Sequence, residues 1–160
     1  MTKRVLLAID LGSPSTRAAS YAVQLAARLK FSLVLMAVSP ANGKRLKDSD
    51  IPLEELPKDQ RAWLDRVVGE SRREEVNLEI FISFNPFYEE LLRFVESRAA
   101  IDFIIMGLPD DGPREGRGEP PHPLESIHSS FDGEVLLVRP RGEILRLSDH
   151  LNLTNPEKES

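Results

Sequence analysis

Four short stretches of the chain are apolar at almost every position, and each is closed by a turn-forming residue. They span 5–9, 31–38, 102–107 and 135–138. Such runs predict strands that are buried on both faces, as in a parallel sheet. A fifth stretch, 78–83, alternates apolar and less apolar positions, which predicts a strand with one less buried face near an edge of the sheet.

Helical spacing of apolar residues separates these strands. Ser13 and Pro14 form a cap-then-proline pair, which predicts a helix over 14–30. Pro57 opens a second helix, Asn85-Pro86 a third, and a short one is expected at 124–131. Strands that alternate with helices predict an α/β fold, an open doubly wound parallel sheet with helices on both faces.

Two segments break this pattern. Residues 108–123 hold five prolines and three glycines, so a surface loop without regular structure is expected there. Residues 141–160 carry one weakly amphipathic stretch and a polar end. We therefore expect a domain over 1–140 and a tail over 141–160 that is either disordered or packs at a dimer interface.

Composition removes several classes of function. The 160 residues are 41% hydrophobic and 29% charged, contain no Cys and carry a net charge of −5. A disulfide scaffold and a thiolate metal site are excluded, and the negative charge argues against a nucleic-acid partner. No apolar run approaches the roughly 20 residues that span a bilayer, and Asp10 interrupts any signal-peptide core. We expect a cytoplasmic protein without membrane insertion.

Three stretches of the sequence carry a family resemblance. They are Val5-Leu-Leu-Ala-Ile-Asp10 running into Ser15–Ala22, then Asn85-Pro86 with its helix, and Ile101-Asp-Phe-Ile-Ile-Met-Gly107. From Lys3 to Arg139 the chain resembles the universal stress protein family. The resemblance implies an adenine nucleotide alpha hydrolase-like fold with five parallel strands in the order 3-2-1-4-5. It also implies a homodimer and, in one subclass, ATP bound between the first and fourth strands.

The ATP-binding subclass is marked by Gly-x2-Gly-x9-Gly-Ser/Thr after the fourth strand, where bare backbone N–H groups approach phosphate. Here Gly107 matches the first glycine, Asp110 replaces the second, and Glu125-Ser126 replaces Gly-Ser. Residues 108–123 also hold four carboxylates against two arginines. The motif is therefore degenerate, and we expect no cofactor. If ATP did bind, the resemblance would assign the contacts to Asp10, Val38, Gly107 and Ser126.

Asp10 has a second interpretation, as a cap that accepts backbone N–H bonds in the turn after the first strand. No catalytic or metal site emerges from the remaining residues. His122, His128 and His150 lack metal-ligand spacing, and the sequence holds no Gly-x-Ser-x-Gly elbow.

The expected fifth strand carries the strongest interaction signal. Val135, Leu136, Leu137 and Val138 would form a flat apolar edge, and such edges are usually paired or covered. We expect two copies to pair along this strand, with Ile144, Leu145 and Leu147 folding over the joint.

The sequence thus predicts a non-catalytic, homodimeric stress-response or regulatory module with an unidentified protein partner. The alternatives are an ATP-binding stress sensor of the same fold and a slow nucleotide hydrolase.

Overall fold

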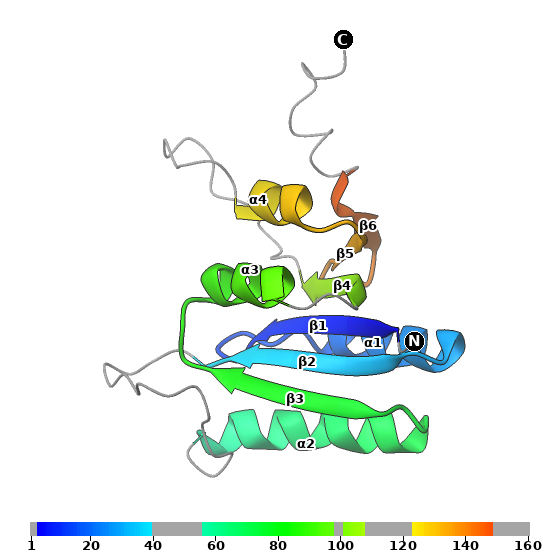
Figure 1. The fold of residues 1–160 in the computed structure, drawn as a ribbon. Coiled ribbons are helices and arrows are strands. Elements are labelled where there is room, and N and C mark those ends of the chain that lie inside the picture. The colour runs from blue at the N-terminus through cyan, green and yellow to red at the C-terminus, as the bar shows by residue number, and fades with distance from the viewer. Residues whose placement is uncertain (1–2, 40–55, 98–100, 108–122, 149–160) are drawn as a thin grey trace.

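Helices and strands alternate along the part of the chain that the computed structural model describes, residues 3–39, 56–97, 101–107 and 123–148. The elements are β1 (Arg4–Asp10), α1 (Thr16–Leu29), β2 (Ser32–Val38), α2 (Lys58–Arg73), β3 (Leu78–Ser83), α3 (Phe87–Ser97), β4 (Ile101–Gly107), α4 (Pro123–Ser130), β5 (Glu134–Val138) and β6 (Ile144–Arg146). The five strands and four helices predicted from the hydrophobic pattern are all present (Figure 1).

The strands form one sheet in the order β3-β2-β1-β4-β5-β6. The first five strands are parallel, in the predicted order 3-2-1-4-5. The predicted number of strands was wrong, because β6 adds a sixth, antiparallel strand along the outer side of β5. The prediction that Val135–Val138 forms an open edge was wrong, because β6 makes β5 an inner strand, whereas β3 is an edge strand as predicted.

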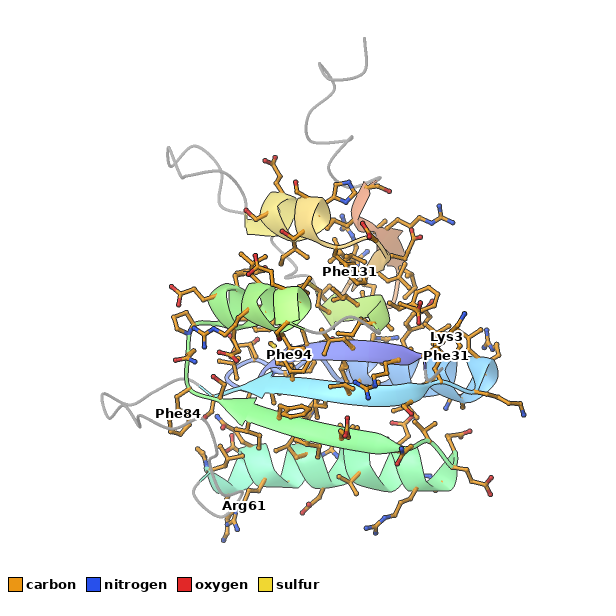
Figure 2. The ribbon with its side chains drawn as sticks, in the orientation of Figure 1. Lys3, Phe31, Arg61, Phe84, Phe94 and Phe131 are labelled. Atoms are coloured by element: carbon orange, nitrogen blue, oxygen red, sulfur yellow. The ribbon has the colours of Figure 1, made fainter. Side chains whose placement is uncertain are left out.

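The alternation of side chains along β1 divides the core into two layers. Val5, Leu7 and Ile9 pack on the side of α1 and α2. Leu6 and Ala8 face the other way and join a second cluster with residues of α3 and α4. In Figure 2, Phe94 lies between α3 and the sheet, in this second layer. The doubly wound architecture therefore follows from strands that are apolar on both faces.

The helix α1 begins two residues later than Ser13 and Pro14 predicted. Ser15 is its N-cap, and the Ser15 Oγ accepts a hydrogen bond of 3.1 Å from the Ala18 N–H. Ser13 is instead part of the turn after β1, because its N–H donates to the Asp10 carbonyl at 2.9 Å. This turn leaves a polar segment between strand and helix at the carboxyl end of the sheet.

A tight hairpin connects β5 to β6. Gly142 adopts a φ of 101°, and its N–H donates to the Arg139 carbonyl at 2.8 Å. A positive φ of this size suits glycine, so Gly142 allows the chain to reverse here. After β6, Leu147 is only 1% exposed and belongs to the core layer under α3 and α4. The sheet thus extends past residue 140, where we had expected a tail to begin.

The two ends of the parallel strands differ in character. At the amino end, Lys3 lies over the Phe31 ring, with 6.0 Å from the Nζ to the ring centroid, and Figure 2 shows the two together. The carboxyl end holds the polar β1–α1 turn. None of the described helices is long and apolar enough to cross a membrane.

We predict that Leu147→Ala lowers the free energy of unfolding by about 2–5 kcal/mol, because it removes a buried side chain from a packed core. Chemical denaturation measures the change. The matched control is Leu29→Ala, since Leu29 is 37% exposed on α1 and its truncation should cost less than about 1 kcal/mol. Equal effects of the two variants would contradict the placement of residues 144–148 in the domain.

Candidate functional site

A pocket of about 710 Å³ opens at the carboxyl ends of β1 and β4. Its lining residues come from the β1–α1 segment, the start of α3, the end of β4 and the β5–β6 hairpin. They are Ala8, Ile9, Asp10, Ser13, Pro14, Ser15, Thr16, Arg17, Phe87, Tyr88, Gly107, Val138 and Pro140. In the sheet order, β1 and β4 are the neighbours at which the strand sequence reverses, and this is where open α/β sheets bind ligands.

Asp10 ends β1 and lines the pocket. Its Oδ1 accepts a hydrogen bond of 2.9 Å from the Gly12 N–H, which fixes the turn into α1. This is the capping interpretation made from the sequence. Asp10 also remains exposed on the pocket wall, so its second carboxylate oxygen can accept from a ligand.

Gly107 ends β4 and lies directly against the N-cap of α1. A Cβ built on Gly107 would stand 2.7 Å from the Ser15 Cβ and 3.0 Å from the Ser15 Oγ. Real Cβ atoms do not approach this closely, so only glycine admits the start of α1 at this distance. Packing alone therefore accounts for a glycine at residue 107.

The other two predicted contacts do not join this pocket. Val38 ends β2 with 4% exposure and packs in the core layer under α3, and its carbonyl accepts from the Leu11 N–H at 2.7 Å. Ser126 lies on an exposed position of α4, next to Ile127, which faces the core. The geometry brings Asp10 and Gly107 together and leaves Val38 and Ser126 outside the lining. Whether any of the four contacts a nucleotide stays a prediction.

The first turn of α1 supplies three polar side chains to the pocket. Ser15 caps the helix, as described above. The Thr16 Oγ1 accepts a hydrogen bond of 3.1 Å from the indole Nε1 of Trp63 in α2. Arg17 lies across the β5–β6 hairpin, because a Cβ built on Gly142 would stand 2.9 Å from the Arg17 Nη1. These side chains lie in a stretch that carries the family resemblance, but they were not predicted as site residues, because a serine and an arginine at a helix start carry no distinctive signal of binding.

Two aromatic residues at the start of α3 complete the lining. The Phe87 and Tyr88 rings meet edge to face, with 5.0 Å between their centroids. Desolvation by burial raises the pKa of the Tyr88 phenol above its usual 10.0. Tyr88 thus stays protonated at neutral pH and keeps an O–H that can donate. The pocket offers apolar surface on this side and polar groups along α1.

Reactive groups are sparse in this lining. Within the described ranges, no group of three or more His, Asp or Glu side chains could hold a metal ion. The segment that carries Asp110 and Asp111 lies in 108–122, outside the described residues. What the described lining provides is a shape and a set of hydrogen-bonding groups suited to a small polar ligand.

Comparison with known proteins finds a family model that matches the sequence and solved structures that share the fold. The family model of the universal stress protein family matches residues 1–117. A member of that family from Burkholderia pseudomallei is 22% identical with a TM-score of 0.54, over 85% of this chain and 95% of its own.

Two further solved structures align over 86% of this chain and 98% of their own. A universal stress protein in complex with cAMP is 17% identical with a TM-score of 0.58, and one from Archaeoglobus fulgidus is 16% identical with a TM-score of 0.54. At these identities the solved structures confirm the predicted fold alone. No curated protein matches the chain.

We predict that Gly107→Ala lowers the free energy of unfolding by about 1–3 kcal/mol, because the new methyl group overlaps Ser15. Thermal or chemical unfolding measures the loss. In the double variant Gly107→Ala/Ser15→Gly the Cβ of residue 15 is gone, and a glycine N-cap costs only a few tenths of a kcal/mol. The double variant should therefore be more stable than Gly107→Ala alone, and strictly additive losses would show that the contact is not the cause.

Proposed function

The chain belongs to the universal stress protein family, and from this membership we propose that it is a non-catalytic, homodimeric stress-response module of the cytoplasm that does not bind ATP. Its role is to present a folded surface to a protein partner. The proposal differs from an ATP-dependent switch in one respect of sequence: two of the three motif glycines, which would leave bare backbone for phosphate, are replaced.

The contact between Gly107 and Ser15 carries this proposal. Gly107 is the one glycine of the phosphate motif that the sequence retains. The space that a side chain at residue 107 would need is occupied by Ser15, the N-cap of α1. The Ser15 Cβ lies 2.7 Å from the position that a Cβ of residue 107 would take. The glycine thus serves packing and gives no evidence of phosphate binding at residue 107.

The residues that depart from the motif support the same proposal. Asp110 stands where the second glycine would be, and Glu125 replaces the third. Each substitution puts a carboxylate at a motif position that serves the triphosphate in the ATP-binding subclass, and like charges repel. Both changes therefore weaken ATP binding.

A second candidate function is a sensor that binds an adenine nucleotide or a related small molecule. The pocket of about 710 Å³ at the switch point favours it, because ligand sites of this kind span roughly 300–1,000 Å³. The structurally similar universal stress protein in complex with cAMP supports the same candidate. A nucleotide hydrolase has less support, since the described lining offers one carboxylate, Asp10, which already accepts from Gly12.

The homodimer is proposed to form along the outer edge of the sheet. Because β6 covers β5 from Leu136 to Val138, the strand that a second copy can reach is β6. Edge strands present backbone N–H and C=O groups that another chain can pair with, and a two-fold axis lets both copies use the same strand. Ile144 is 38% exposed on β6 and would be covered in such a pair.

The expected result for ATP is that protein purified without added ligand releases no adenine nucleotide on denaturation. Titration calorimetry with Mg-ATP should likewise give no saturable heat at 0.1 mM protein, about the concentration that detects weak binding. Stoichiometric nucleotide would overturn the main proposal in favour of the sensor. Phosphate release above the buffer rate would instead support the hydrolase.

Sedimentation velocity tests the dimer. We expect a dimer at micromolar concentration, and we expect Ile144→Lys to weaken it by about tenfold or more, because a buried edge does not tolerate an unpaired charge. The control is Leu29→Lys, which places the same charge on α1, away from the sheet edge. A wild-type chain that sediments as a monomer throughout would refute the homodimer.

A further inference from the structure

Arg17 carries a positive charge at a position in the fold that disfavours one. It lies in the first turn of α1, a turn that holds no acidic residue. The positive end of the helix dipole disfavours a cation here by some tenths of a kcal/mol. Among the described residues the ion pairs are Arg93–Glu90, Arg139–Glu143 and Arg146–Glu134, and none of them includes Arg17. Arg17 is exposed and forms no direct ion pair with a described carboxylate, although Asp10 lines the same pocket.

The β5–β6 hairpin holds Arg17 on the pocket wall. The Arg17 Nη1 would lie 2.9 Å, and its Cζ 3.7 Å, from a Cβ built on Gly142. The guanidinium therefore rests against the bare backbone of Gly142, and Pro140 of the same hairpin lines the pocket with it. Packing positions the charged group beside the cavity.

The hydroxyl groups of Ser15 and Thr16, next to Arg17, are free to act as hydrogen-bond donors. The Ser15 Oγ accepts from the Ala18 N–H, and the Thr16 Oγ1 accepts from the Trp63 indole. A backbone N–H and an indole N–H can only donate, so each hydroxyl oxygen serves here as an acceptor. The hydrogen of each hydroxyl is then left to donate to something else, and both side chains line the pocket.

We propose that Arg17, with the Ser15 and Thr16 hydroxyls, forms a subsite in this pocket that selects a ligand carrying a single phosphate group. The planar guanidinium presents parallel N–H donors that match two oxygens of a phosphate, and the two hydroxyls suit a third. Arg17 is the specificity-determining residue, and Gly142 is the positioning residue that keeps the guanidinium at the wall.

This subsite is formed by side chains of the first turn of α1, and of the degenerate motif only Gly107 lies against it, in contact with Ser15. It rests on the second candidate function, a small-molecule sensor, and it names the chemistry that such a sensor would recognise. A single phosphate on α1 is compatible with failure to bind ATP, because it needs no glycine-rich cradle.

The test compares three probes: adenosine 5′-monophosphate, adenosine and inorganic phosphate. Binding is followed by calorimetry and by the emission of Trp63, the single tryptophan of the chain, whose indole bonds to Thr16. The wild-type protein should bind the monophosphate about tenfold or more tightly than adenosine, which corresponds to about 1.4 kcal/mol. In Arg17→Gln this preference should fall below about threefold, and Arg17→Lys should retain part of it.

The matched control is Arg28→Gln, the same substitution in the last turn of the same helix. It should leave the preference unchanged. Gly142→Ala should weaken binding of the monophosphate and of inorganic phosphate more than binding of adenosine, because the added Cβ displaces the guanidinium, whereas the strain at a φ of 101° affects all three probes. Unfolding curves for each variant establish that the fold is retained.

Each outcome decides the inference. If inorganic phosphate binds in a way that depends on Arg17 and adenosine does not bind, the subsite is supported. The ligand of the second candidate function would then not be recognised by its adenine. Equal affinity for the monophosphate and adenosine, or a preference that survives Arg17→Gln, overturns the subsite while the sensor stands. If none of the three probes binds the wild-type protein, the inference is overturned.

Discussion

The close approach of α1 to the end of β4 is the constraint on which the pocket depends. Ser15 reaches Gly107 so closely that no other residue fits at position 107. This contact fixes where α1 begins, and the start of α1 determines where Thr16 and Arg17 lie. The Thr16–Trp63 hydrogen bond then ties the same turn to α2. One short contact thereby connects the sheet to both helices of its layer and sets the polar wall of the site.

Most of the fold could be predicted because its strands are short apolar runs with clear ends. Asp10 and Gly107 end adjacent strands, so their meeting in one pocket follows from strand order. The strand β6 was missed because its three residues alternate exposed, half-buried and exposed, a pattern too short to be distinguished from a loop. Its pairing depends on the turn at Gly142, whose conformation the sequence does not reveal. The N-cap was misplaced because Ser13 and Ser15 flank the same proline.

The candidate site was harder to predict than the fold, because it depends on the rotation of helices and on contacts between residues far apart in the sequence. Ser126 and Ile127 are neighbours on α4, and the rotation of the helix decides that Ile127 enters the core and Ser126 faces outward. Arg17 and Gly142 are far apart in the sequence and meet at the hairpin that joins β5 to β6. The family match covers residues 1–117, which include the α1 side of the pocket, whereas the hairpin side comes from residues beyond 117.

The hairpin after β5 also determines when the site can exist during synthesis. A nascent chain that has emerged as far as Gly107 already contains β1 and β4, but it lacks Val138 and Pro140 of the pocket lining and Gly142, against which Arg17 rests. Domains fold from the amino end as the ribosome releases them. The lining of this pocket is therefore complete only after synthesis has passed the hairpin at Gly142.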